Sequence, residues 1–149
     1  MGLVGLNAKP WKLSKKVLPQ HTDHAGVMWH GSYLNWLEEA RIKALAQTGL
    51  SYSDLSKEGF ELPVIELKIK YISSLHHGDE VIMESSVLGK TGLRVPWETN
   101  FLKNGNIISA KAYVELVITR LDKKGTRLVR KYPSFLSAAI RKLQEGPSQ

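Results

Sequence analysis

The spacing of apolar residues changes once along this chain, and the change restricts the folds that the chain can adopt. Across residues 32–48 the apolar residues recur with the 3.6-residue period of an amphipathic helix. Across residues 63–119 the period falls to two, which is typical of strands with one buried face. We therefore expect one long helix followed by a run of long strands. The buried stripe of the helix is formed by Tyr33, Leu37, Ala40 and Ala44.

Turns rich in Gly, Asn and Asp divide the second region into four expected strands, at residues 63–73, 79–89, 93–102 and 107–119. The alternation predicts that the first strand is half-buried, on the face formed by Ile65, Leu67, Ile69 and Tyr71. Shorter elements are also expected. They are a strand at residues 11–19, a short helix at 51–59, a strand near 127–130 and a helix from Pro133.

These elements predict an α+β protein in which an antiparallel sheet wraps around one central helix. Residues 32–48 form the only expected element that is long enough to cover the apolar face of such a sheet. The sheet leaves edge strands unpaired, and a symmetric dimer can pair them. We therefore expect a homo-oligomer, either a homodimer or a homotetramer.

The length of 149 residues indicates a single domain over 1–149, with an ordered core at about 9–145. The sequence has no apolar run near the ~20 residues needed to span a bilayer, so no membrane span is expected. It shows no export signal, and we expect a cytoplasmic location. The absence of cysteine excludes a cysteine nucleophile and fits a reducing compartment.

The net charge of +7 predicts an affinity for anions, such as nucleic acid, an anionic membrane or a phosphorylated small molecule. The basic residues are dispersed, with neither the aromatic interleaving nor the motifs of nucleic-acid readout. A nucleic-acid partner is therefore not expected.

Residues 20–41, QHTDHAGVMWHGSYLNWLEEAR, hold the densest group of chemically reactive side chains. Three functions are open for this segment: a metal site, a catalytic loop that leads into the helix, or a polar turn that happens to contain histidines. The possible metal ligands are His21, Asp23, His24 and His30. They do not follow a standard zinc spacing such as His-Glu-x-x-His, so we expect no metal.

The polar turn is the simplest interpretation, with Asp23 closing an Asx-turn before Gly26. A catalytic loop is favoured by the combination of a carboxylate, a glycine, apolar residues and a helix start. The carboxylate can act as a nucleophile or activate water, and free N–H groups at the helix start can stabilise an oxyanion. No Gly-x-Ser-x-Gly motif is present, so Ser32 is expected to cap the helix instead of acting as a nucleophile.

The segment TDHAGVMWHGSYLNWLEEAR resembles the signature of the hotdog-fold acyl-CoA thioesterases of the 4-hydroxybenzoyl-CoA thioesterase family. In that signature an aspartate precedes a small residue, a glycine, two aliphatic residues, an aromatic residue and a tyrosine-bearing helix ending in Glu-x-Ala-Arg. The matching positions are Asp23, Gly26, Val27, Met28, Trp29, His30, Tyr33, Glu38, Ala40 and Arg41. The hotdog fold that the resemblance implies agrees with the α+β arrangement expected from periodicity.

The resemblance implies that Asp23 is the catalytic carboxylate, as nucleophile or as general base. It implies that the backbone N–H groups of His30, Gly31 and Ser32 polarise the thioester carbonyl, and that His30 orients substrate or water. The implied substrate pocket, located between subunits, includes Gly26, Val27, Trp29 and Tyr33. His24 departs from the pattern, since the family usually has proline, alanine or glycine there. No metal or organic cofactor is implied, because coenzyme A is part of the substrate.

The implied function is hydrolysis of an acyl-CoA thioester to free CoA and a carboxylic acid. The resemblance also admits aromatic substrates such as 1,4-dihydroxy-2-naphthoyl-CoA. Two alternatives use the same fold: a hydroxyacyl-thioester dehydratase and a non-enzymatic acyl-CoA binding protein. Basic side chains at the mouth of the site would hold the phosphates of CoA, and the candidates are Lys68, Lys70, Lys90 and Arg94.

Overall fold

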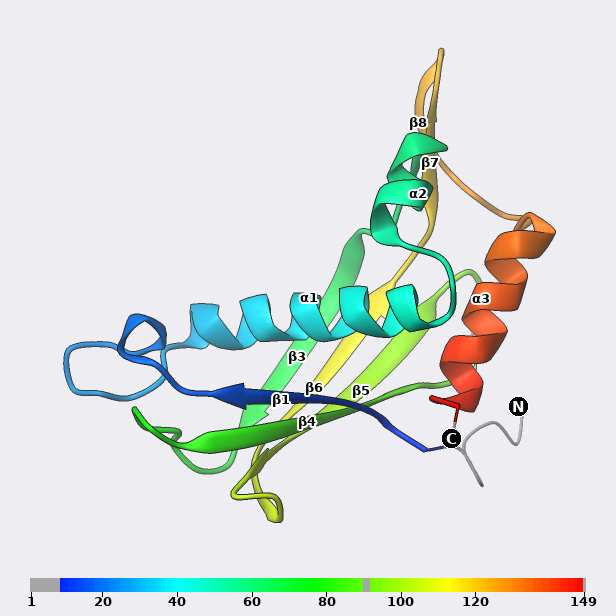
Figure 1. The fold of residues 1–149 in the computed structure, drawn as a ribbon. Helices are drawn as coiled ribbons and strands as arrows, with labels where there is room; N and C mark the ends of the chain where they lie inside the picture. Colours follow the sequence, from blue (N-terminus) through cyan, green and yellow to red (C-terminus); the bar gives the residue numbers. More distant parts are fainter. Residues whose placement is uncertain (1–8, 90–91, 149) are drawn as a thin grey trace.

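The computed structural model describes residues 9–89 and 92–148, and in this part of the chain one long helix crosses a five-stranded antiparallel sheet (Figure 1). The strand order is β1-β4-β5-β6-β3. The strands are β1 (Trp11–Lys16), β3 (Val64–Tyr71), β4 (Glu80–Val87), β5 (Val95–Lys103) and β6 (Ile107–Leu116). A separate three-stranded sheet has the order β2-β7-β8, formed by β2 (Phe60–Glu61), β7 (Thr119–Asp122) and β8 (Gly125–Leu128).

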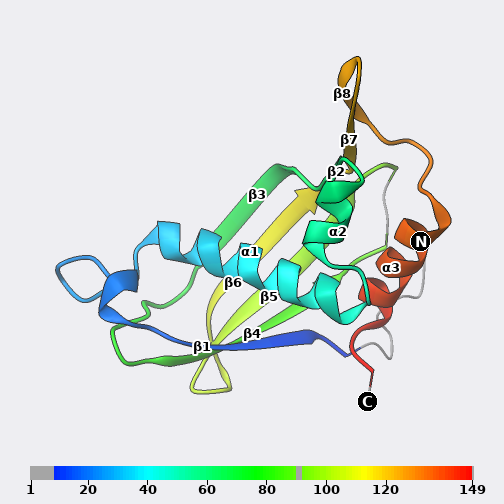
Figure 2. The same ribbon diagram turned by 45° about the horizontal axis from the view of Figure 1, so that its top comes forward.

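The helical elements are η1 (Pro19–His21), α1 (His30–Gln47), α2 (Tyr52–Lys57) and α3 (Ser134–Glu145). Helix α1 lies across one face of the large sheet, while α3 stands at the end of the sheet where α1 finishes (Figure 2). This arrangement confirms the α+β hotdog fold expected from the periodicity. Among residues 9–89 and 92–148, no helix has both the length and the apolar character needed to cross a bilayer.

The core lies between α1 and the inner faces of β5 and β6. The helix contributes the expected stripe, and alternate residues of β6, from Ala110 to Leu116, are buried beneath it. Two of these, Ala110 and Ala112, are small, so the helix can lie close to the middle of the sheet. The apolar stripe of the helix and the apolar faces of the strands therefore pack against each other in a single core.

Strand β3 differs from the prediction that it is half-buried. Ile65, Leu67 and Tyr71 are exposed in the chain, and Tyr71 keeps 52% of its surface accessible. The reason is the position of β3 at the edge of the sheet, where it pairs only with β6 and where Tyr71 meets α1 through the ring of Tyr33. The strand therefore presents both a free backbone edge and apolar side chains to its surroundings.

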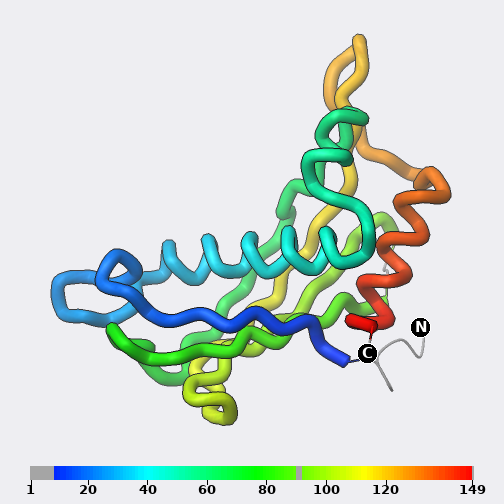
Figure 3. The backbone as a smooth tube through the Cα atoms, in the orientation of Figure 1, coloured from blue at the N-terminus to red at the C-terminus, as the bar shows by residue number. Residues whose placement is uncertain are grey.

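Trp11 joins the first strand to the last helix. Its indole Nε1–H donates to the Leu143 carbonyl at 2.8 Å, and both residues are buried. This bond fixes β1, which runs alongside β4, to the end of α3 (Figure 3). Two other buried tryptophans, Trp36 and Trp97, have indole N–H groups without an acceptor among the described residues.

We expect Trp11→Phe to lower the free energy of unfolding by more than Trp97→Phe does, by about 1–3 kcal/mol, because only the first substitution leaves a buried carbonyl unpaired. Both substitutions remove the same atoms, so the loss of volume is matched. Urea unfolding followed by circular dichroism measures the difference. Equal losses for the two variants would show that the bond to Leu143 adds no stability.

Candidate active site

The loop before α1 holds Asp23 in a defined orientation. Its Oδ1 atom accepts hydrogen bonds from the N–H groups of Ala25 at 2.9 Å and Val27 at 3.1 Å. The Asp23 N–H donates to the Val27 carbonyl at 2.9 Å, and Gly26 has a φ of 79°, in the left-handed region that glycine tolerates. Oδ2 makes no hydrogen bond to any residue in the described part of the chain, and Asp23 is exposed. One carboxylate oxygen is thus anchored, and the other can meet a substrate.

A distant segment of the chain holds this loop in place. The Met28 N–H donates to the Leu75 carbonyl at 2.8 Å, and the His77 N–H donates to the Gly26 carbonyl at 3.0 Å. Both partners lie in the connection between β3 and β4, which passes beside the loop at the end of the molecule where α1 begins (Figure 3). The loop is therefore supported by the edge of the sheet, a contact that no local sequence signal predicts.

The first turn of α1 provides two free amides. Trp29 is the N-cap residue, and the Ser32 N–H donates to its carbonyl at 3.0 Å. The Ser32 hydroxyl donates to the His21 carbonyl, so Ser32 ties the helix to η1 and is not the cap that the sequence predicted. The N–H groups of His30 and Gly31 have no acceptor among residues 9–89 and 92–148. With the positive end of the helix dipole behind them, these two amides can bind developing negative charge.

The side chain of Trp29 lies over Gly31. A Cβ atom built on Gly31 would lie only 2.1 Å from the nearest carbon of the six-membered ring of Trp29, which is 46% exposed. The His30 ring stands edge-on to the same indole, with 5.4 Å between the ring centroids. The indole therefore forms an apolar wall beside the two free amides, and this wall needs glycine at position 31.

We expect Gly31→Ala to lower kcat/KM by at least about tenfold, because the new methyl group displaces Trp29 from beside the amides. Alanine is favoured over glycine inside a helix by up to ~1 kcal/mol, so thermal unfolding should not shift downwards. Steady-state kinetics and a melting curve on one preparation test both statements. Unchanged kcat/KM would show that the position of Trp29 does not matter for turnover.

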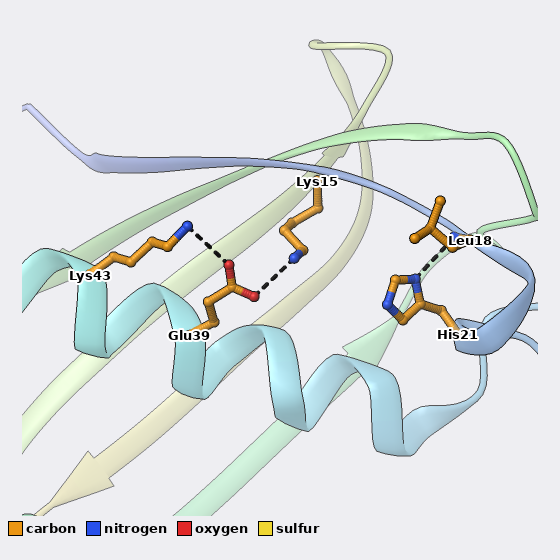
Figure 4. A network of polar contacts seen from close by, with 5 residues as sticks. All are labelled: Lys15, Leu18, His21, Glu39 and Lys43. Atoms are coloured by element: carbon orange, nitrogen blue, oxygen red, sulfur yellow. Dashed lines mark hydrogen bonds and ion pairs between the residues drawn. The ribbon is translucent and has the colours of Figure 1, made fainter.

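His21 has a structural role. Its Nδ1 atom accepts the Leu18 N–H at 3.0 Å, and its ring packs edge-on against Trp36 with centroids 5.2 Å apart. Burial, together with the nearby Lys15, lowers the pKa of His21, which favours the neutral form that can accept this bond. Figure 4 shows the hydrogen bond between Leu18 and His21. It also shows the Glu39 carboxylate, which pairs with the ammonium groups of Lys15 at 2.9 Å and Lys43 at 3.2 Å.

Tyr33 lies in the interior, between α1 and the sheet. Its ring is 5.1 Å from that of Tyr71 and 5.2 Å from that of Phe101, both edge-on. Burial and the neighbouring Tyr71 raise the pKa of Tyr33 to about 12, so the phenol stays neutral at physiological pH. Through Tyr71 this ring connects the start of α1 to the exposed edge of β3.

The structure brings together most of the predicted site residues at the start of α1: Asp23, Gly26, Val27, Trp29, His30, Gly31, Ser32 and Tyr33. His24 is an exposed neighbour in the same loop. Within the described residues, no three His, Asp or Glu side chains gather as a metal ion would require.

The predicted CoA-binding cations do not join this group within one chain. Lys70 is exposed on β3, on the face opposite Tyr71, because successive strand residues point to opposite faces. Arg94 lies just before β5, at the other end of the sheet, where it pairs with Glu115 at 2.9 Å. Tyr113 also donates to Glu115, and this bond raises the pKa of Tyr113 to about 12. Lys90 lies outside the described residues.

An antiparallel sheet around one helix, with a carboxylate loop and free amides at the start of that helix, defines a class: the hotdog-fold thioester hydrolases. The family model described as the Thioesterase-like superfamily matches residues 17–140 of this chain. The chain belongs to that superfamily.

Two relatives share similar sequences. One is the candidate esterase sll0410 of Synechocystis, 28% identical over 146 residues that cover 96% of this chain and 86% of the relative. The other is the candidate acyl-CoA thioesterase YneP of Bacillus subtilis, 29% identical over 91 residues, which are 61% of this chain and 66% of the relative. The solved DHNA-CoA thioesterase of Staphylococcus aureus has the same fold, with a TM-score of 0.76. It is 24% identical, and the match covers 87% of this chain and 88% of that one.

Proposed function

We propose that this protein hydrolyses an acyl-CoA thioester to free CoA and a carboxylic acid, with Asp23 as the catalytic carboxylate and without a metal. The observation that carries the proposal is the position of the anchored Asp23 carboxylate in the loop that leads into the free N–H groups of His30 and Gly31. A carbonyl oxygen held by those amides would place its carbon within reach of an activated nucleophile.

Two routes fit this geometry. In the first, the free Oδ2 atom takes a proton from water while the water oxygen attacks the carbonyl carbon, and the C–S bond then breaks to release CoA thiolate. In the second, Oδ2 itself attacks, CoA thiolate leaves, and water hydrolyses the mixed anhydride. In both routes the negative charge on the carbonyl oxygen is stabilised by the two amides. The His30 side chain, beside Trp29, is placed to orient the substrate or the water.

The substrate class and the assembly are parts of the same proposal. An aromatic acyl group such as 1,4-dihydroxy-2-naphthoyl can pack against the exposed Trp29, and the name of the structurally similar Staphylococcus aureus enzyme supports this class.

We further propose a homodimer paired along β3, since that edge is apolar and unpaired among the described residues. The edge also lies next to the site, because Tyr71 contacts Tyr33.

A thiol-release assay over aromatic and aliphatic acyl-CoAs tests the proposal, with the corresponding N-acetylcysteamine thioesters as a comparison. We expect turnover of at least one acyl-CoA, and weaker activity on the truncated thioester because it lacks the phosphates that basic residues can bind. Binding without thiol release would indicate a non-enzymatic acyl-CoA binding protein. Loss of water from a hydroxyacyl-CoA without thiol release would indicate a dehydratase.

A further inference from the structure

The connection between β3 and β4 forms a short antiparallel pairing with the Asp23 loop. Val27 and His76 face each other in this pairing, with a backbone hydrogen bond on either side of them. Both backbone groups of Val27 also bond to Asp23. The Val27 N–H donates to Oδ1 at 3.1 Å, and the Val27 carbonyl accepts the Asp23 N–H at 2.9 Å. The position of His76 therefore bears on the Asp23 carboxylate through a single residue, Val27.

The side chain of Asp79 holds His76 in place. Its Oδ2 atom accepts the His76 N–H at 2.7 Å, and the Asp79 N–H donates to the His76 carbonyl at 3.0 Å. The same Oδ2 atom lies 3.4 Å from Nζ of Lys103, at the end of β5, and the Asp79 side chain is only 20% exposed. Without this carboxylate the His76 N–H would lose its acceptor within the protein.

The two ends of this turn are fixed by other contacts. Leu75 and Val17 are both fully buried. The Val17 N–H donates to the Asp79 carbonyl at 2.9 Å, and the Val17 carbonyl accepts the Gly78 N–H at 2.8 Å. These contacts do not involve the Asp79 side chain. Removal of the carboxylate should therefore loosen His76 without unfolding the strands on either side of the turn.

We propose that Asp79 is a positioning residue for Asp23, acting through His76 and Val27. This role rests on the proposed function, because the position of Asp23 affects turnover only if Asp23 is the catalytic carboxylate. A misplacement of about 1 Å in a reacting group can lower a rate by about 10²-fold, so a small movement of the loop is sufficient.

Steady-state kinetics of the full chain, with the acyl-CoA that it hydrolyses best, tests the proposal. We expect Asp79→Ala to lower kcat by about tenfold with little change in KM, because the orientation of Asp23 affects the reacting step more than the binding of CoA. Asp79→Asn should recover most of kcat, since its carbonyl oxygen can still accept the His76 N–H. Lys103→Met removes only the ion pair and should leave kcat within about twofold.

Asp122→Ala is the matched control. Asp122 accepts the Lys124 N–H at 2.8 Å and pairs with Arg127 at 3.0 Å, so this variant loses the same two kinds of contact. These contacts lie in the turn between β7 and β8, at the end of the molecule away from the start of α1 (Figure 1). The kcat of Asp122→Ala should equal that of the unaltered chain.

A second comparison separates positioning from a general loss of structure. In the Asp23→Asn background, Asp79→Ala should lower the remaining activity by less than about twofold, because no carboxylate is left to position. A general loss of structure would lower activity by the same factor in both backgrounds.

Amide hydrogen exchange, followed by NMR on the full chain, provides a measurement that needs no turnover. In Asp79→Ala the amides of Val27 and Met28 should exchange about tenfold faster, while that of Ala112 in the middle of β6 should not change. If no acyl-CoA is hydrolysed, the proposed function fails, and this measurement alone decides whether Asp79 holds the loop. The proposal is overturned if Asp79→Ala keeps full kcat or unaltered exchange, if Asp79→Asn is equally impaired, or if Asp122→Ala loses as much kcat.

Discussion

Replacement of Asp23 by asparagine is expected to reduce kcat by about 10²–10⁴-fold on whichever acyl-CoA the protein hydrolyses best, because both proposed routes need the carboxylate charge. In this loop the substitution removes the charge without removing the hydrogen-bond acceptor. Asparagine keeps a carbonyl oxygen that can accept the same N–H groups of Ala25 and Val27, so the loop should retain its shape. Steady-state kinetics with thiol detection measures the effect, and the thermal unfolding curve should remain unchanged.

Two comparisons make this result specific. Asp54→Asn removes a carboxylate from the exposed helix α2 and should leave kcat unchanged. Asp23→Ala removes the loop acceptor as well as the charge, so it should lower both kcat and the free energy of unfolding, the latter by about 1–2 kcal/mol. Full activity in Asp23→Asn would show that another group performs the chemistry.

Replacement of Leu67 by lysine is expected to weaken the proposed homodimer by about 10–100-fold, because it exchanges an exposed apolar side chain on the β3 edge for a charge. Fully burying such a side chain contributes ~1.5–3 kcal/mol, and two related copies would meet at a symmetric interface. Size-exclusion chromatography with light scattering measures the mass over a dilution series. We also expect kcat/KM to fall as the dimer dissociates, since Tyr71 of the same edge contacts Tyr33 beside the site.

Leu121→Lys provides the matched control. Leu121 is 62% exposed on β7, in the small sheet that stands away from the β3 edge (Figure 1). The control variant should keep the mass and activity of the unaltered chain. A Leu67→Lys protein that kept both would show that copies of this chain do not pair along β3.

Most of the fold could be predicted from local patterns. The 3.6-residue period of α1 and the period of two in β4, β5 and β6 each depend on neighbouring residues and on one buried face. The exposure of β3 could not be predicted in this way. Its apolar alternation is the same as that of a strand beneath the helix, and only its place in the strand order decides what covers it.

In the candidate site too, local contacts could be predicted from the sequence and long-range contacts could not. The sequence by itself determined the Asp23 loop, because a carboxylate, a glycine and a helix start lie within a few residues of one another and their hydrogen bonds are local. Tertiary structure decided that Ser32 bonds to His21, that the connection near Leu75 supports the loop, and that Lys103 pairs with Asp79. These contacts join residues far apart in the chain, and their energies depend on packing and desolvation that appear only after the sheet has closed over the helix.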